Sequence, residues 1–381
     1  GQNENVIFDV FFRQNPCNNG YSVCAGLDQV IDYIKNLHFT YDDVDYLRGL
    51  GIFKEDFLHY LSGFHFSGDI YAIPEGTVVF PKEPLLKVVA PIMEAQLVET
   101  AILNIINHQS LIATKTSRIV FAANGDGIME FGLRRAQGPD AGLYGARAAM
   151  IGGCVGTSNV LAGQLFDVPV KGTHAHSWIM SFPDELTAFR TYAKMYPDAC
   201  ILLVDTYDTL KSGVPHAIEV FKELRDAGIT SKLLGIRLDS GDIAYLSKKA
   251  RKMLDDAGFT NAIISASSDL DEYLIENLIM VQKAPYDILA AGTKLVTAYD
   301  TPALGGVFKT KSYMGQPKIK IAEGKTTIPG MTDTLRIIRN GKFEGDVICR
   351  AEDTDLIRDG RLTRNIASYA LGSQNGARAT F

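Results

Sequence analysis

The sequence predicts an α/β fold: an irregular α/β (TIM-like) barrel with a second, smaller α+β domain built from N- and C-terminal segments. Two observations predict this class. Between residues 118 and 293, short β-prone runs alternate with amphipathic helices, which is typical of right-handed βα units and a mostly parallel sheet. Both ends of the chain carry alternating, β-branched stretches, which are typical of antiparallel strands. No GxGxxG or GxxxxGKS/T motif opens a helix, so a Rossmann or P-loop sheet is disfavoured.

The first hundred residues combine helices with a small sheet. Residues 26–37 have apolar side chains at helical spacing, and a second helix would be capped by Thr40 and stop at Gly49 or Gly51. Residues 68–91 alternate in polarity and are rich in β-branched residues, which predicts a small antiparallel sheet. A mostly apolar helix, which we expect to be buried, follows at about 94–113.

The central part of the chain repeats one unit. Eight β-prone runs lie at 118–123, 127–132, 153–159, 168–173, 200–205, 233–239, 262–267 and 287–293. The helix that ends at Gly228 has Ile218, Phe221 and Leu224 on one apolar stripe, and the helix that ends at Gly258 has a similar stripe. Seven or eight such units favour a closed barrel over an open doubly wound sheet.

The chain turns sheet-like again after Gly305, with a hairpin signal at Asn340–Gly341. This segment could pair with the N-terminal sheet. We therefore expect a discontinuous α+β domain from 1–95 and 306–350, a barrel with the active site at 96–305, and a C-terminal tail at 351–381.

Composition excludes several classes of protein. The 381 residues are 46% hydrophobic and 22% charged, with a formal charge of −6 and a pI of about 5.7, which disfavours a generic basic nucleic-acid surface. We see no signal peptide and no apolar run near the ~20 residues that span a bilayer, so we expect a cytoplasmic protein. Five scattered cysteines without a CxxC pair predict reduced thiols and neither a disulfide framework nor a zinc ribbon.

Polar or glycine residues follow nearly every predicted strand, where βα barrels carry their chemistry. They are Arg134, Arg135, Thr157, Ser158, Asn159, Thr173, His176, Ser177, Asp205, Thr206, Asp208, Arg237, Asp239, Ser240, Gly241, Asp242, Ser267, Ser268, Asp269, Gly292, Thr293 and Lys294. Strand ends that meet at one rim would bring these side chains together, so the sequence predicts one site there.

The segment "GIRLDSGD" offers both a structural and a functional interpretation. Asp239 or Ser240 could simply cap the following helix, a contribution of about 1 kcal/mol. Capping does not explain Arg237 at the end of an apolar strand, where a charge is costly unless it is paired or bound to a ligand. We favour a functional Arg237–Asp239 pair.

The polar segments at the other strand ends, which we call tips, also allow two interpretations. Asp205 and Asp208 could cap a helix, or could bind ribose hydroxyls or Mg²⁺. The tips "SSDLDE" and "AAGTKL" precede helices and could cradle phosphates, although a tip of this kind is most often only a cap.

An aromatic carboxylate would fit the segment "EFGLRRAQGPDAG". Phe131 could be an ordinary core residue, but beside Arg134 and Arg135 it could form a flat slot closed by a guanidinium.

His174 and His176 lie two residues apart in "GTHAHS". No third zinc ligand stands at a suitable spacing, so a zinc site is not expected. We interpret His174 as a structural neighbour and His176 as the working histidine, because a histidine held by carboxylates is a better base or nucleophile.

Taken together, these tips resemble the nicotinate phosphoribosyltransferase family, the type II phosphoribosyltransferases of NAD biosynthesis. The resembling segments are "EFGLRRAQGPD", "GGCVGTSNVLAG", "VKGTHAHSWIMSF", "LLVDTYDT", "GIRLDSGD", "ISASSDLDE" and "AAGTKLVTAYDTPALGGVFK". The resemblance covers roughly residues 6–350 in family order, and the segments are highly specific as a set. "RRAQGPD" and "GTHAHS" favour the nicotinate enzymes over the related nicotinamide enzymes.

The resemblance implies a reaction and an assembly. Nicotinate and phosphoribosyl pyrophosphate would give nicotinate mononucleotide and pyrophosphate, coupled to ATP hydrolysis, with Mg²⁺ bound mainly through substrate phosphates and no dedicated protein metal site. It also implies a head-to-tail homodimer that completes each site, and a tyrosine segment ahead of Gly1 that reaches the neighbouring subunit. Neither nucleic acid nor a membrane is an expected partner.

The resemblance also assigns roles to residues. His176 matches the histidine that the family phosphorylates, and Asp205 and Asp239 match acidic residues around it and the ribose. The residues matching positions near the pyridine ring and its carboxylate are Phe131, Arg134, Thr173, Ser177 and Arg237. The residues matching the phosphate-binding loops are Ser268, Asp269, Gly292 and Thr293.

Two alternatives stay open at this point. The chain could transfer the phosphoribosyl group to nicotinamide or quinolinate, or it could be a metabolite-binding barrel without catalytic activity.

Overall fold

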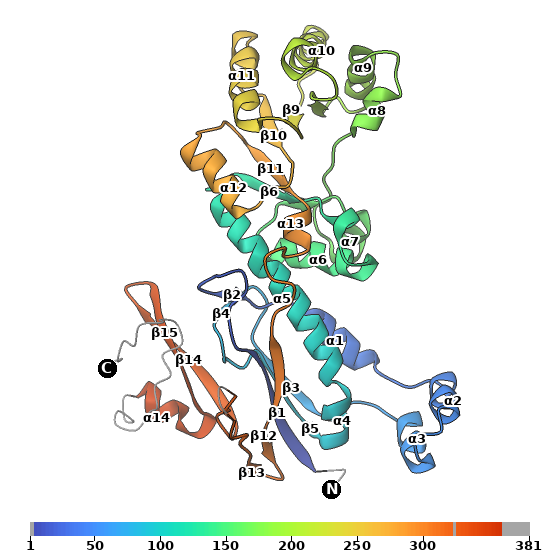
Figure 1. The fold of residues 1–381 in the computed structure, drawn as a ribbon, viewed down its shortest axis with the longest axis vertical. Coiled ribbons are helices and arrows are strands. Elements are labelled where there is room, and N and C mark those ends of the chain that lie inside the picture. Colours follow the sequence, from blue (N-terminus) through green and yellow to red (C-terminus); the bar gives the residue numbers. More distant parts are fainter. Residues whose placement is uncertain (1–3, 323–324, 360–381) are drawn as a thin grey trace. The chain divides into compact units, whose positions relative to one another are not determined.

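The computed structural model describes residues 4–322 and 325–359 of the 381-residue chain (Figure 1). The described residues form two compact units, one from 4–111 with 303–322 and 325–359, and the other from 112–302. The chain passes from the first unit to the second within the helix α5 (Glu99–Ala122). Within the described residues, no helix is both long and apolar enough to span a bilayer.

The first unit is built on a five-stranded antiparallel sheet. Its order is β13–β12–β1–β5–β3, formed by β1 (Asn5–Phe12), β3 (Asp69–Ala72), β5 (Leu86–Pro91), β12 (Gly306–Tyr313) and β13 (Gln316–Pro317). The first strand pairs with the late strand β12, with Val10 opposite Phe308, so the two ends of the chain share one sheet (Figure 1). The predicted pairing of the late segment with the N-terminal sheet is confirmed.

Short elements complete the first unit. The two-stranded pairs are β2 (Ser22–Val23) with β4 (Val78–Val79), and β14 (Thr332–Arg339) with β15 (Lys342–Arg350). Asn340 and Gly341 both have positive φ, 52° and 74°, as the turn of a tight hairpin requires. The helices are α1 (Leu27–Asn36), α2 (Tyr41–Gly49), α3 (Glu55–Ser62), α4 (Ile92–Leu97), η4 (Ala351–Asp353) and α14 (Thr354–Arg358). Thr40 caps α2 as predicted. Part of the predicted 351–381 tail, residues 360–381, lies outside the described residues.

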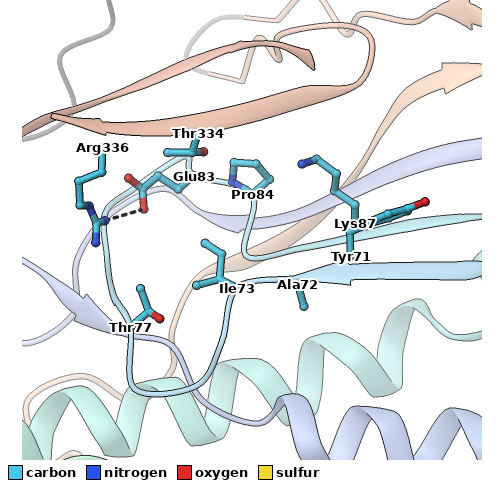
Figure 2. Close-up of a pocket in the computed structure, with 9 residues that line it drawn as sticks. All are labelled: Tyr71, Ala72, Ile73, Thr77, Glu83, Pro84, Lys87, Thr334 and Arg336. Atoms are coloured by element: carbon cyan, nitrogen blue, oxygen red, sulfur yellow. Dashed lines mark ion pairs between the residues drawn. The ribbon is translucent and has the colours of Figure 1, made fainter. Parts of the chain in front are cut away.

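A pocket of about 300 Å³ lies in this unit, beside the β14–β15 hairpin (Figure 2). Glu83 and Pro84 form one part of its wall, and Arg336 on β14 lies 3.8 Å from the Glu83 carboxylate. Arg336 also forms a two-point pair with Asp346 on β15, at 2.8 and 3.0 Å. One guanidinium therefore serves two buried carboxylates.

The second unit is an α/β structure built on a parallel sheet. The sheet has the order β7–β6–β11–β10–β9–β8, formed by β6 (Gly127–Glu130), β7 (Gly156–Thr157), β8 (Ala199–Leu203), β9 (Leu233–Leu238), β10 (Ile263–Ala266) and β11 (Ile288–Ala291). The helices are α6 (Pro139–Ile151), α7 (Val160–Phe166), α8 (His176–Met180), α9 (Glu185–Met195), α10 (Val214–Asp226), α11 (Ile243–Asp256), α12 (Glu272–Glu276) and α13 (Thr293–Val296). Three single-turn elements are η1 (Leu133–Arg135), η2 (Thr209–Gly213) and η3 (Asn277–Val281).

This architecture confirms the predicted α/β class with a parallel sheet, but within the described residues the edge strands β7 and β8 do not pair, so the sheet does not close into a full barrel. Two strand predictions were also wrong. Residues 118–122 belong to α5, which extends nine residues past the predicted helix end at 113. A short apolar run cannot be told from a buried helix by periodicity alone, and here Ile119 in the helix is fully buried. The run 168–173 contributes only an isolated bridge from Val170 to Thr157. The sheet in the described residues therefore has six strands, fewer than the seven or eight counted.

A buried ion-pair cluster fixes α5 inside the second unit. Lys115 is fully buried, and its Nζ lies 2.7 Å from Glu272 Oε2 and 2.6 Å from Asp300 Oδ2. Glu272 also accepts a hydrogen bond from Arg118 Nε at 2.8 Å. Burial alone would lower the pKa of Lys115, but the two carboxylates outweigh it and the pKa is raised. The ammonium therefore stays charged.

Candidate active site

All six strands of the second unit are parallel, so their carboxyl ends lie along one edge of the sheet. Asp205 and Thr206 follow β8, Arg237 lies in β9, and Asp239 follows that strand. Ser267 follows β10, and Gly292 follows β11. The predicted polar tips therefore leave the sheet on the same side.

Arg237 is the centre of a hydrogen-bonded group. Its Nη2 lies 2.9 Å from Asp239 Oδ1, its Nη1 donates to Thr173 Oγ1 at 2.7 Å, and its Nε donates to Ser267 Oγ at 3.0 Å. Ser267 also donates to Asp239 Oδ1. Since three different loops hold the guanidinium, its position is fixed before any ligand arrives.

His176 lies beside this group with its two ring nitrogens in different surroundings. Its Nε2 lies 3.9 Å from Asp205 Oδ1 and 3.8 Å from Asp239 Oδ2, while Nδ1 lies 3.0 Å from Thr206 Oγ1. The His176 side chain is 37% exposed, so a ligand can reach the ring. The structure thus brings His176 together with Arg237, Asp239 and Asp205, as the strand-end argument predicts.

Asp205 is almost fully buried, and its two oxygens differ. Oδ2 accepts hydrogen bonds from the Asp239 backbone N–H and the Ser240 hydroxyl, both at 2.7 Å. Oδ1 is buried and has no hydrogen-bond partner in the described structure. A buried carboxylate oxygen without a donor is costly, so this atom is a candidate to bind a cation or a hydroxyl of a ligand.

His174 is buried and structural. Its Nε2 accepts a hydrogen bond from the Leu203 backbone N–H at 3.3 Å, and its ring packs edge-on against Tyr192 with centroids 4.6 Å apart. Burial lowers the pKa of His174 to about 4, so the ring is neutral at physiological pH. This agrees with the interpretation of His174 as the structural neighbour.

Phe131 lies under the guanidinium, with Arg237 Cζ 5.9 Å from the ring centroid. The Phe131 backbone N–H donates to Ala291 O at 2.9 Å, which joins β6 to the end of β11. Gly292 approaches closely there, because a Cβ at Gly292 would lie 3.2 Å from the Phe131 carbonyl oxygen. Arg134 and Arg135 lie in η1 and are exposed.

The acidic residues that cap helices here are not the ones that lie near His176. Asp208 caps η2 by accepting from Lys211 N, so the capping interpretation holds for this residue. Asp242, and not Asp239 or Ser240, caps α11 by accepting from Tyr245 N at 3.0 Å. Asp205 and Asp239 are therefore left for the site.

Four of the predicted residues, Ser177, Ser268, Asp269 and Thr293, lie in helix starts and a loop and do not bond to Arg237 or His176 in the described structure. Ser177 and Thr293 lie in the first turns of α8 and α13, while Ser268 and Asp269 are exposed loop residues with φ of 115° and 43°. Across residues 4–322 and 325–359, no hydrogen bond links these four to Arg237 or His176. Thr173, by contrast, bonds Arg237 directly.

The sequence reasoning missed two functional candidates, Thr206 and Glu130. Thr206 was noted only as part of a tip. Glu130 ends the apolar strand β6 and is 1% exposed, and it accepts from Thr157 Oγ1 at 2.6 Å and from the Gly132 N–H. Burial raises the pKa of Glu130. The sequence did carry a signal for Glu130. It is a charged residue at the end of an apolar strand, and the same feature singled out Arg237.

The site offers little for a metal ion by itself. In the part of the chain that the structure describes, no three His, Cys, Asp or Glu side chains come together closely enough to hold one. Asp205 Oδ1 and Asp239 Oδ2 supply two carboxylate oxygens near His176. That donor set fits a Mg²⁺ ion whose other ligands are phosphate oxygens and water.

Comparisons with known proteins show the family to which the chain is related. Residues 1–107 match the nicotinate phosphoribosyltransferase N-terminal domain, and residues 127–273 match the nicotinate phosphoribosyltransferase family. The chain is 52% identical to the nicotinate phosphoribosyltransferase of Bacillus subtilis over 351 residues, covering 90% of this chain and 71% of that protein. It is 45% identical to a Mycobacterium tuberculosis nicotinate phosphoribosyltransferase over 381 residues, covering 98% and 81%. The crystal structure of human nicotinic acid phosphoribosyltransferase superposes with a TM-score of 0.81 at 29% identity, covering 92% of this chain and 78% of that one.

Proposed function

This chain belongs to the nicotinate phosphoribosyltransferase family of NAD biosynthesis, and we propose that it converts nicotinate and phosphoribosyl pyrophosphate to nicotinate mononucleotide and pyrophosphate, coupled to ATP hydrolysis through His176. The observation that carries the proposal is the convergence of His176, Asp205, Arg237 and Asp239 at the carboxyl ends of neighbouring strands.

The pyridine substrate would lie against Phe131. An aromatic ring and a guanidinium that face each other form a slot for a flat anion, because the ring stacks and the guanidinium pairs with a carboxylate. Arg237 would be a ligand here, with Thr173 and Ser267 holding it in place. Arg134 and Ser177 are exposed, and we propose that they contact the nicotinate carboxylate.

The transfer step needs stabilisation of positive charge. The pyridine nitrogen lone pair would form a bond to ribose C1, while the bond from C1 to pyrophosphate breaks and its electron pair leaves with the pyrophosphate. C1 then carries oxocarbenium character, which Asp205 and Asp239 would stabilise. The loops at Ser268–Asp269 and Gly292–Thr293 would bind the phosphates through backbone N–H groups. Mg²⁺, bound mainly through the substrate's phosphate oxygens, would neutralise charge on the leaving group.

The coupling to ATP would use Nδ1 of His176. Because Nε2 faces two carboxylates, its proton is favoured there, and the lone pair is then on Nδ1, beside the Thr206 hydroxyl. Nδ1 would attack the γ-phosphorus of ATP, so that a P–N bond forms and the P–O bond to ADP breaks. Water later attacks the phosphorus, so that the P–N bond breaks, inorganic phosphate leaves and the histidine is restored. The added phosphoryl charge would favour the arrangement that holds the cationic ribose.

The assembly is also part of the proposal. We propose a cytoplasmic homodimer, in which a neighbouring subunit completes each site, because the family resemblance implies that arrangement.

The direct test is product formation. The protein would be incubated with phosphoribosyl pyrophosphate, Mg²⁺ and ATP together with nicotinate, nicotinamide or quinolinate, and the products would be identified by mass. We expect nicotinate mononucleotide, pyrophosphate and ADP from nicotinate. Preferred use of another pyridine would move the chain to a different activity, and no release of pyrophosphate with any of them would indicate a non-catalytic barrel.

A further inference from the structure

Glu130 holds the backbone on one side of the stacking residue. Its Oε1 accepts the N–H of Gly132, and its Oε2 accepts the hydroxyl of Thr157 at 2.6 Å. Thr157 Oγ1 in turn accepts the N–H of Asn159, at 3.0 Å, at the start of α7. One buried carboxylate thus joins the segment after β6 to the neighbouring strand β7.

The peptide groups on both sides of Phe131 are therefore fixed. The Phe131 N–H is bonded to Ala291 O at 2.9 Å, and the next N–H, of Gly132, is bonded to Glu130. Gly132 is confined as well, since a Cβ there would lie 2.5 Å from Val296 Cβ and 2.8 Å from Gly292 O. The backbone of Phe131 has almost no freedom, so the carboxylate helps to set the height and tilt of its ring.

A buried carboxylate at this place has a cost that packing does not explain. Glu130 is 1% exposed, and burial is the largest influence on its raised pKa, which the hydrogen bonds from Thr157 and Gly132 oppose. An apolar residue of similar size would avoid the desolvation penalty, but it would leave the Gly132 N–H and the Thr157 hydroxyl without this acceptor.

We propose that Glu130 is a positioning residue for the pyridine slot: it touches no substrate but fixes the Phe131 ring against which the pyridine stacks. This rests on the proposed function, in which Phe131 forms the slot. Loss of the carboxylate would weaken pyridine binding more than phosphate binding, because Glu130 itself bonds Gly132 and Thr157, whereas the loop after β11 meets this segment only through the packing of Gly292 against Gly132.

The test separates the two substrates. We expect Glu130→Ala to raise the KM and the calorimetric Kd for nicotinate about tenfold or more, with the KM for phosphoribosyl pyrophosphate changed less than about twofold. Glu130→Gln, which keeps an acceptor for the Gly132 N–H, should recover most of the loss. Equal changes for both substrates, or none, would overturn the proposal.

Two further comparisons keep the test decisive if Glu130→Ala folds poorly. Thr157→Val removes one donor and should raise the KM and Kd for nicotinate, whereas Thr157→Ser should not. Glu185→Gln is the matched control, because Glu185 is also a buried carboxylate of this unit but bonds His216 at 2.8 Å. Glu185→Gln should leave the KM and Kd for nicotinate and the KM for phosphoribosyl pyrophosphate unchanged, even if the free energy of unfolding falls. Wild-type protein that binds nicotinate without turnover would refute the proposed reaction but not the role of Glu130, and a Kd insensitive to Glu130 would refute the role alone.

Discussion

Glu83 should make the first unit less stable as the pH rises, and Glu83→Gln tests this. The Glu83 side chain is fully buried; Oε2 accepts from the Phe80 N–H at 2.9 Å, and Oε1 has no hydrogen-bond partner in the described structure. Arg336 is the nearest cation, but both of its short bonds go to Asp346, and it lies 3.8 Å from Glu83 (Figure 2). Two buried carboxylates therefore share one positive charge. Burial first, and then the neighbouring Asp346, raise the pKa of Glu83 to about 8.

The sign and size follow from proton linkage. An unfolded glutamate titrates near pH ~4.3, so between about pH 4.3 and 8 the folded state holds a proton on Glu83 that the unfolded state has lost. The stabilisation is fully present below that window and is lost as the pH rises through it, by up to about 1.4 kcal/mol per pH unit. From pH ~5.5 to ~8 the loss from this one group is on the order of 3 kcal/mol, as an upper estimate.

Glu83→Gln keeps the shape of the protonated side chain and removes the titration. The variant and the wild type should have similar unfolding free energies near pH 5.5, and the variant should become increasingly more stable toward pH 8. Urea denaturation followed by circular dichroism over this range measures the difference, and hydrogen exchange in β14 and β15 reports the local effect. Glu344→Gln, an exposed change on the same hairpin, is the control. Parallel stability curves for wild type and Glu83→Gln would refute the reasoning, because they would mean that Glu83 binds no extra proton on folding.

Three further changes test the second unit. His176→Ala should abolish ATP-dependent stimulation with an unchanged circular dichroism spectrum, and a variant still labelled by γ-labelled ATP would remove His176 from this role. Arg237→Ala should lower kcat/KM for nicotinate by roughly a hundredfold, since it removes a charged, three-point-bonded ligand; near-normal kinetics would contradict the strand-end argument. Lys115→Met should cost about 3 kcal/mol or less of unfolding free energy, because Glu272 and Asp300 lose a buried cation while Glu272 keeps its pair with Arg118. The exposed pair of Lys252 is the control, and Lys252→Met should cost less than about 1 kcal/mol.

The parts of the fold that the sequence predicts well are those set by local chemistry. Asn340 and Gly341 specify a tight hairpin wherever they stand, because both tolerate positive φ, and Thr40 with Asp43 forms a capping box within one turn. The convergence of Asp205 with Arg237 and Asp239 was also predictable, whereas the segment before His176 forms only an isolated bridge. The carboxyl ends of parallel strands must lie at one edge, so an assignment of parallel strands fixes which tips can meet.

The parts that it does not predict depend on distant contacts. The run at 118–123 has the composition of a strand, but α5 continues to Ala122 and Ile119 is fully buried in it. The role of Glu130 depends on the hydroxyl of Thr157, 27 residues later and on the neighbouring strand. Nothing in either segment alone shows that the two lie side by side.

The spacing of the acidic residues near His176 carries information that a count of polar residues does not. In two strand-end loops, acids stand three residues apart: Asp205 with Asp208, and Asp239 with Asp242. In both loops the second acid caps the following helical element, because only a residue directly before the first turn can reach its free N–H groups. The first acid lies closer to the strand end and cannot cap, so it is left to face His176. Capping therefore does not compete with the proposed site within one loop, since each loop has one acid that caps and another that lies beside His176.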